Sequence, residues 1–334
     1  MQDKVMFKFV NFVMNSGKSF QMQKFFSIIN HRDFVLSLAL VVGLILGEHT
    51  RPLAELSVYT LAFVMVFATT GFSFKNWVPI GNALKPLAWS TFLNFIVFGL
   101  VLIGLSWLFF SNDPGHRYFP YYVGFILVAA APPGPSVIPF STMLNGDNNF
   151  SVTGVFGLHF IAMVLTPLIL LLFLGDSLID PLKIFNIMVQ LIVIPLIISR
   201  FLRHKKILPT IEKHRETVIK WGFFLVVTPI MGMSASVFFA EPGIVLTMSL
   251  ILLISMYVLG FLYHIIMDKS GARRSMIISS TFMMTTKSSA FSAVAAFTFF
   301  QGEPMIALPS AVVSVFVTLF IIVYSGFLKW WEKK

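Results

Sequence analysis

The polar segment Thr285-Thr286-Lys287-Ser288-Ser289 lies in the middle of the long apolar run 272–299 and carries a full positive charge. A Lys at the centre of a membrane helix costs at least about 2.5–3.5 kcal/mol, and its side chain reaches water only from near a helix end. We therefore expect Lys287 to face a wet cavity, to bind an anion, or to be neutral part of the time. Its removal should then leave the fold intact. The alternative is a structural Lys held only by backbone carbonyls and hydroxyl groups.

A second polar interruption, Ala131-Pro132-Pro133-Gly134-Pro135-Ser136, divides the apolar run 119–144. Proline cannot continue a helix, and in lipid such a break persists only where it faces protein or a water-filled cavity. The simpler alternative is a structural kink. Paired interruptions in corresponding helices indicate the binding site of a transporter. The predicted substrate-binding residues are Lys287, Thr285, Thr286, Ser288, Pro133, Gly134, Pro135, Ser136 and Asn94.

Two of the remaining polar residues within apolar runs are His159 and Asn94. His159 could relay protons, so Lys287 and His159 are the candidates for proton coupling; a hydrogen-bonded structural His is the alternative. Asn94 either lines a cavity or joins helices by hydrogen bonds. The chain has no Cys, and the predicted spans contain neither an acidic pair nor an HExxH-type ligand set. We expect no cofactor, no metal site and no enzymatic activity.

The elements that must position these residues are transmembrane helices. The chain is 57% hydrophobic and only 11% charged, with a mean hydropathy of +0.86, whereas a soluble domain carries about 25% charged residues. A span needs about 20 apolar residues. We predict ten spans, at 34–49, 52–73, 84–110, 119–144, 149–174, 182–202, 217–239, 243–267, 272–299 and 304–328.

The basic residues are divided unequally between the two sides of the predicted membrane. With a cytoplasmic N-terminus, all 24 Lys and Arg residues except Arg51, Arg117, Lys183 and Lys287 fall in cytoplasmic segments. Cytoplasmic loops are enriched in Lys and Arg, so we predict an integral protein of the plasma (bacterial inner) membrane with both termini in the cytoplasm. This arrangement accounts for the net charge of +10 without a nucleic-acid partner.

The spans fall into two sets of five. Because five is odd, the second set enters the membrane from the opposite side, which is the geometry of an inverted-topology repeat. We predict an all-α polytopic membrane protein with ten transmembrane helices, two inverted five-helix repeats and broken crossing helices four and nine. The predicted segments are a cytoplasmic N-terminal segment, amphipathic or flexible, at 1–32; the first repeat at 33–175; the first helix of the second repeat at 176–202; a basic cytoplasmic loop at 203–216; the remaining four helices at 217–329; and a cytoplasmic tail at 330–334.

Several short motifs in this order resemble the bile acid/sodium symporter family. They are Ala131-Pro132-Pro133-Gly134, Leu144-Asn145-Gly146-Asp147, Leu165-Thr166-Pro167 and Ala307-Leu308-Pro309. The resemblance covers roughly residues 33–329. It implies that the domain holding the crossing helices moves against a panel domain, and that substrate binds beside the crossover with alternating access.

The sequence departs from this family at the residues that the resemblance assigns to sodium. Val137-Ile138 replaces a Ser-Asn pair, and Leu158 and Ala162 replace hydroxyl-bearing residues. Phe282 replaces a Glu, and Thr286-Lys287 replaces a Gln-Asn pair. Because hard cations need oxygen ligands, the resemblance implies a family member without the usual sodium sites, with the Lys ammonium supplying a positive charge in place of the ion.

The predicted function is secondary active transport of a small organic anion by alternating access, independent of sodium, with proton coupling or exchange. The partners are therefore the organic anion, the lipid bilayer and protons. One alternative is a sodium-coupled symporter of bile-acid-like or other organic anions. Another is a membrane sensor or scaffold that does not transport.

Overall fold

The computed structural model describes residues 32–71, 81–110, 113–175, 178, 180–300 and 303–333. The predicted N-terminal segment 1–32 lies outside them, except for Arg32. Nearly all the described residues are helical, and their only strand-like pairing is an isolated bridge. The helices are α2 Arg32–Leu46, α3 Arg51–Glu55, α4 Ser57–Thr70, α5 Gly81–Thr91, α6 Gly99–Phe109, α7 Phe119–Ala130, α8 Val137–Met143, α9 Asn148–Leu174, α10 Pro181–Met188, α11 Ile194–Leu202, α12 Leu208–Met233, α13 Ala235–Ala240, α14 Pro242–Leu252, α15 Leu259–Lys269, α16 Arg274–Thr285, α17 Ser289–Phe299 and α18 Pro304–Trp331, with a 3₁₀ turn η1 Gly47–Thr50 and the π-helical segments η3 Phe92–Phe98, η4 Val189–Val193 and η5 Leu253–Val258.

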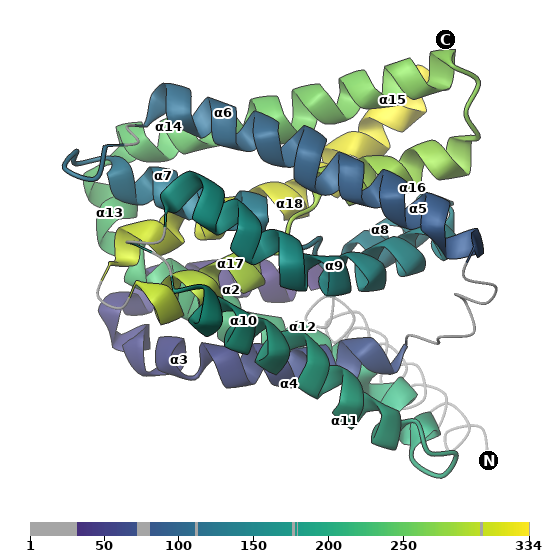
Figure 1. Ribbon diagram of the computed structural model, residues 1–334, viewed down its shortest axis with the longest axis horizontal. Helices are drawn as coiled ribbons and strands as arrows, with labels where there is room; N and C mark the ends of the chain where they lie inside the picture. The colour runs from purple at the N-terminus through teal and green to yellow at the C-terminus, as the bar shows by residue number, and fades with distance from the viewer. Residues whose placement is uncertain are drawn as a thin grey trace, which may run out of the picture.

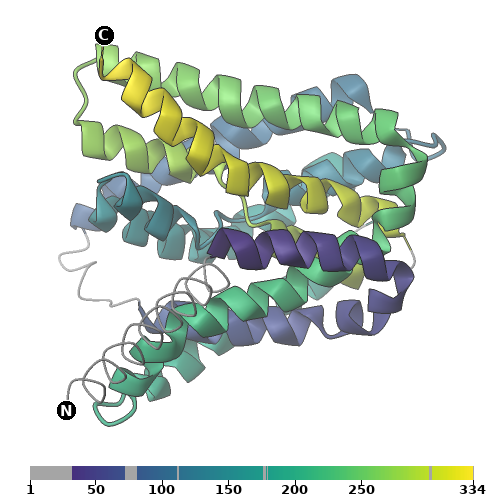
Figure 2. The same ribbon diagram turned by 180° about the vertical axis from the view of Figure 1, so that it is seen from behind.

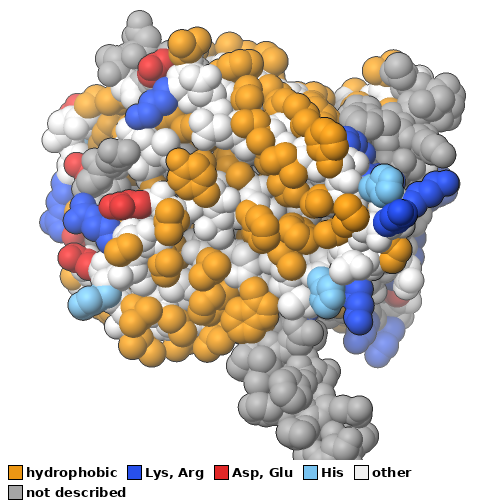
Figure 3. Space-filling view, turned by 90° about the horizontal axis from the view of Figure 1, so that it is seen from below, with side chains coloured by type: hydrophobic (Ala, Val, Ile, Leu, Met, Phe, Trp, Pro, Cys, Tyr) orange, Lys and Arg blue, Asp and Glu red, His pale blue; other side chains and the backbone are white. Residues whose placement is uncertain are grey.

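The helices form a layered bundle in which most axes run along the length of the molecule, while α11, α12 and α18 run obliquely (Figures 1 and 2). Helices α2 to α4 and α10 to α12 make one outer layer, α5, α6, α14 and α15 lie on the opposite side, and α7, α8, α9 and α17 lie between them, while α18 crosses obliquely from the opposite side into the middle of the bundle (Figures 1 and 2). Exposed apolar side chains cover the middle of the face near α3, α4 and α11 (Figure 3). Such a wide apolar surface is suited to lipid rather than water.

Within the described residues, six helices are long and apolar enough to cross a membrane. A seventh is added if Leu38–Glu55 and Ser57–Thr70, which meet at 74°, form one span. The six helices are Ala83–Phe109, Asn148–Leu174, Leu182–Leu202, Leu208–Met233, Pro242–Lys269 and Met305–Trp331. They overlap six of the predicted apolar runs, with the largest shift at 217–239, where the helix is Leu208–Met233.

The structure corrects the predicted basic loop 203–216. Only residues 203–207 form a turn, and α12 begins at Leu208, so the second half of the predicted loop belongs to a helix. Pro209 stands in the first turn of α12, where a missing N–H does no harm. The following residues contain no Gly or Pro up to Gly222, and charged residues such as Lys213 are good helix formers.

Both predicted interruptions are present. Helix α7 ends at Ala130, and Ala131 is extended with φ −67° and ψ 147°. Helix α16 ends at Thr285, and the next helix begins after Ser288, whose side chain accepts a hydrogen bond from the backbone N–H of Phe291. The prolines end the first helix because they lack donors. The second interruption ends in a Ser N-cap, which is a common start of a helix.

Gly124 permits the close contact between α7 and α18. A Cβ atom at this position would lie 2.7 Å from Cγ of Pro309 and would also meet the carbonyl of Ile306. We expect Gly124→Ala to destabilise the protein by about 1–3 kcal/mol, which is typical of overpacking, and thus to lower the melting temperature in detergent. The control is Gly104→Ala in α6, where the added Cβ would meet nothing within 4 Å. Equal melting temperatures for the two variants would contradict this account of the contact.

Candidate functional site

The two interruptions meet inside the bundle. The backbone N–H of Gly134 donates to the carbonyl of Thr286 at 3.2 Å, and that of Ser288 donates to the carbonyl of Pro132 at 2.9 Å. These bonds produce the isolated antiparallel bridge between Pro133 and Lys287. Backbone groups left without helical partners are thus satisfied by the other interruption. We call residues 131–136 and 286–288 together the crossing.

Lys287 is buried, with only 2% of its surface exposed. Its ammonium Nζ donates to Oδ1 of Asn94 at 2.8 Å, to the carbonyl of Ala129 at 2.8 Å and to the carbonyl of Ala131 at 2.9 Å. Nζ also lies 4.4 Å from the centroid of the Phe95 ring, a cation–π contact. An ammonium has three N–H donors, so all three are in use.

This geometry differs from the wet cavity expected from the sequence. Lys287 is instead held by neutral acceptors, as in the structural alternative, with an amide oxygen in the place of the expected hydroxyls. Within the described part of the chain, no carboxylate contacts the ammonium. Three neutral oxygens and an aromatic face thus surround Nζ, and none of these contacts supplies a negative charge.

The three oxygens that accept from Nζ come from the end of α7 and from the π-helical segment η3. Ala129 and Ala131 lie at the C-terminal end of α7, where carbonyls lack helical partners and the helix dipole is negative. Asn94 lies in the π-helical segment η3, a feature that frequently marks functional sites. Its Nδ2 donates to the carbonyl of Met283 in α16 at 2.8 Å. Asn94 therefore joins helices by hydrogen bonds, and it is completely buried.

The other predicted binding residues lie in the crossing or next to it, and their side chains differ in solvent exposure. Thr285 and Thr286 are buried, and the Thr285 hydroxyl donates to its own helix at Thr281. Ser136 and Ser288 are each 7% exposed, and Pro135 is half-buried. Pro135, Ser136 and Ser288 are thus residues of the crossing whose side chains are not fully enclosed. A polar group of a substrate could meet the hydroxyl of Ser136 or that of Ser288.

His159 is placed differently. It is 5% exposed, and Nδ1 lies 2.7 Å from the carbonyl of Val155 in the same helix. Among the described residues, no hydrogen bond joins it to the crossing. The structural alternative therefore describes its local contacts, and its part in proton coupling stays a prediction.

A small apolar cavity lies beside the crossing, between α7, α9, α10 and α17. Thr166 is its one polar lining residue, and the Thr166 hydroxyl is already used to donate to the carbonyl of Ala130 at 2.6 Å. The other lining residues are Leu127, Leu170, Ile184, Ile187, Met188, Phe291, Ala295 and Phe299. This cavity offers no group that would hold an anion.

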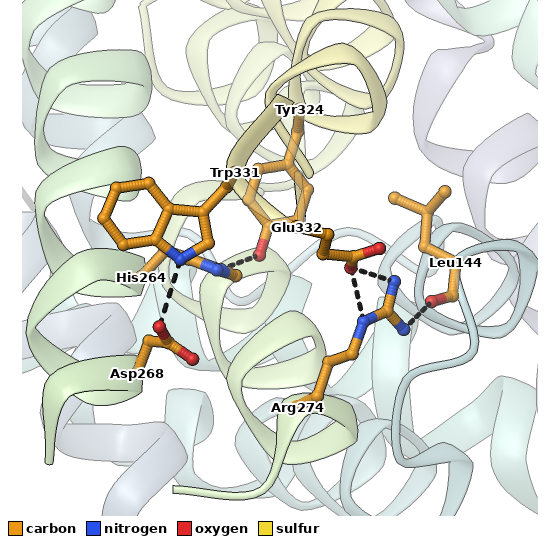
Figure 4. Close-up of polar contacts among 7 residues, drawn as sticks. All are labelled: Leu144, His264, Asp268, Arg274, Tyr324, Trp331 and Glu332. Carbon is orange, nitrogen blue, oxygen red and sulfur yellow. Dashed lines mark hydrogen bonds and ion pairs between the residues drawn. The ribbon is translucent and has the colours of Figure 1, made fainter. Parts of the chain in front are cut away.

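A polar and aromatic cluster joins helices at the C-terminal end of α18 (Figure 4). Nδ1 of His264 lies 2.7 Å from the Tyr324 hydroxyl, and the Trp331 indole donates to Asp268 at 3.0 Å. Arg274 pairs with Glu332 at 2.5 Å and donates to the carbonyl of Leu144 at 3.3 Å. The ion pair is about half exposed, and pairs of this kind contribute at most about 1 kcal/mol.

Sequence reasoning missed most partners of Lys287. The Ala129 and Ala131 acceptors are backbone atoms, so their side chains carry no signal, and Phe95 resembles any other apolar residue of its run. Asn94 was recognisable because it is an isolated polar residue in an apolar run.

An apolar helical bundle in which two interrupted helices meet is an architecture of secondary transporters. The chain is an integral membrane protein of this architectural class. It belongs to the sodium bile acid symporter family, whose model matches residues 58–240. It is also 31% identical over 166 residues to the sodium/bile acid cotransporter 7-B of Xenopus laevis. That alignment covers 47% of this chain and 47% of the relative, so the chain matches about half of the relative's length.

Proposed function

We propose that the chain crosses the membrane ten times in two inverted five-helix repeats, 33–175 and 176–329, with both termini in the cytoplasm. The two crossing interruptions support this arrangement. So do the π-helical segments η3 and η5, which occupy the helices before α7 and α16 respectively. The turn between α11 and α12, the start of α16 and the C-terminus all lie at one end of the bundle (Figure 1). Basic residues are concentrated in these segments, as expected for a cytoplasmic end.

We propose further that the protein is a secondary transporter of a small organic anion, without enzymatic activity. The observation that carries this proposal is the Lys287 ammonium, buried at the crossing without a described carboxylate partner. An uncompensated positive charge in a low dielectric attracts an anion over several ångströms. Because all three donors of Lys287 are in use, direct contacts would come from Ser136, Ser288 and the backbone near Pro135. Lys287 then attracts the substrate through its electrostatic field, without a direct hydrogen bond.

Independence from sodium is the third part of the proposal. The ammonium lies 2.8–2.9 Å from three neutral oxygens, which is the type of ligand that a hard cation would use. The nearby positions Val137, Leu158, Ala162 and Phe282 are apolar and completely buried. We propose that the tethered ammonium replaces a coupling cation, and that any coupling uses protons through Lys287 or His159.

Uptake into proteoliposomes tests these proposals together. Sodium and pH gradients are imposed separately against a panel of labelled organic anions, with protein-free liposomes as the control. We expect saturable uptake of at least one anion that is unchanged when choline replaces sodium. Uptake that requires sodium would contradict the third part, and binding without uptake would indicate a sensor or scaffold.

A sodium-coupled symporter is the second candidate. The similarity to the Xenopus laevis sodium/bile acid cotransporter 7-B favours it. On this candidate the cation would occupy oxygens other than the three around Lys287, and uptake would fail in choline.

A further inference from the structure

The turn between α11 and α12 forms a strongly basic end of the bundle. Residues 200–220 contain the acidic residues Glu212 and Glu216, the histidines His204 and His214, and the basic residues Arg200, Arg203, Lys205, Lys206, Lys213, Arg215 and Lys220. Lys205, Lys206 and Lys213 are exposed. Within the described part of the chain, these three make no ion pair. We call residues 200–220 the basic hairpin.

The base of the basic hairpin is fixed against the end of α4. Nη2 of Arg200 donates to the carbonyl of Thr69 at 2.9 Å. A Cβ atom added to Gly71, the C-cap of α4, would lie 2.8 Å from Nη1 of Arg215. Two guanidinium groups therefore approach the negative end of a helix dipole. They anchor the hairpin, and the exposed lysines beyond them present their charges to other partners.

Large apolar side chains lie next to these charges. Phe201 is 73% exposed, Ile207 is 44% exposed and Trp221 is 38% exposed. At one edge of the molecule, beside the apolar face, His and basic side chains gather with few acidic ones, whereas basic and acidic side chains are mixed at the opposite edge (Figure 3). Trp is enriched at membrane interfaces, and clusters of Lys and Arg there attract anionic headgroups. The juxtaposition matches the boundary between acyl chains and phosphates.

We propose that the basic hairpin is a binding site for anionic phospholipid headgroups, with Lys205, Lys206 and Lys213 contacting the phosphates while Phe201, Ile207 and Trp221 contact the acyl chains. A soluble polyanion would use the charges but leave the apolar groups in water, which is why the combination favours a lipid. This inference does not depend on transport, because the hairpin lies away from the crossing.

The test compares a triple variant with a matched control. The variant is Lys205→Gln/Lys206→Gln/Lys213→Gln. The control, Lys269→Gln/Arg273→Gln/Lys333→Gln, removes three basic residues from the same end of the bundle but from outside the hairpin. Native mass spectrometry of purified full-length protein counts phosphatidylglycerol molecules bound from detergent micelles. Phosphatidylcholine and inorganic phosphate are the other two ligands, and the melting temperature of each variant checks folding.

We expect phosphatidylglycerol to bind the native protein and the control alike, and the hairpin variant on the order of 100-fold more weakly, given the attraction of each of the three Lys near an anionic surface. Raising the salt from about 0.05 to 0.5 M should weaken the binding because exposed charges are screened. Equal binding by the two triple variants, or equal binding of phosphatidylcholine, would overturn the proposal. A response to inorganic phosphate as large as that to phosphatidylglycerol would assign the site to soluble anions and would also overturn it.

Discussion

Replacing Lys287 with Met should destabilise the protein and abolish anion uptake. Met fills a similar volume but supplies no donor, so Oδ1 of Asn94 and the carbonyls of Ala129 and Ala131 lose their hydrogen bonds to Nζ. A buried acceptor left without a donor costs about 1–3 kcal/mol. Three such acceptors cost about 3–9 kcal/mol and removing the charge returns about 2.5–3.5 kcal/mol, so the net destabilisation is at most about 6 kcal/mol. From these contacts we expect a lower melting temperature, whereas the sequence alone predicted that the fold tolerates this loss.

The measurement is the apparent melting temperature in detergent, together with uptake in proteoliposomes. The control is Lys269→Met, which removes a Lys from an exposed helix end and should change neither property. A Lys287→Met variant that melts and transports like the native protein would show that the three hydrogen bonds contribute little and that the proposed mechanism is wrong.

The variant Lys287→Ala tests whether a sodium ion can take the place of the Lys287 ammonium. Truncating the side chain opens a space bounded by the same three oxygens, which a small monovalent cation could fill. We expect NaCl, compared with choline chloride, to raise the melting temperature of Lys287→Ala and to leave that of the native protein unchanged. Sodium-specific, saturable stabilisation of the native protein would instead show a sodium site outside the three oxygens and would contradict sodium independence.

Asn94→Asp should change the net charge around Lys287 while leaving the shape of the site almost unchanged, so it tests the effect of charge on anion affinity. Asp keeps an oxygen acceptor for the ammonium at almost the same volume, but it adds a negative charge beside Lys287 and loses the donor to Met283. If the substrate is held by the field of Lys287, its affinity falls. For unit charges ~8 Å apart and an effective dielectric constant of ~20, the loss is about 2 kcal/mol, or about 30-fold in affinity.

The comparison with Asn94→Leu makes the interpretation specific. Leu removes both hydrogen bonds and should lower the melting temperature, whereas Asp loses one bond and gains an ion pair with Lys287, so its melting temperature should stay closer to that of the native protein. Anion affinity is measured by competition with a labelled substrate. Native affinity in Asn94→Asp would mean that the charge of Lys287 does not reach the substrate, and the field-based part of the proposal would fail.

The membrane class and both helix interruptions followed from the sequence because they depend on local properties. Apolar runs of spanning length identify lipid as the surroundings, and Pro and polar clusters interrupt helices wherever they stand. The boundary between α11 and α12 was harder to predict from the sequence. Charged residues suit both a loop and an exposed helix, so the sequence did not show that α12 begins at Leu208.

What the sequence determined on its own was that Lys287 stands deep in an apolar run and that the prolines at 131–136 disturb a helix. The tertiary structure decided what surrounds that charge. The two interruptions pair through backbone bonds, and Nζ of Lys287 meets two alanine carbonyls. Backbone oxygens are identical at every residue, so their selection as ligands depends on where the chain folds and leaves no trace in residue type.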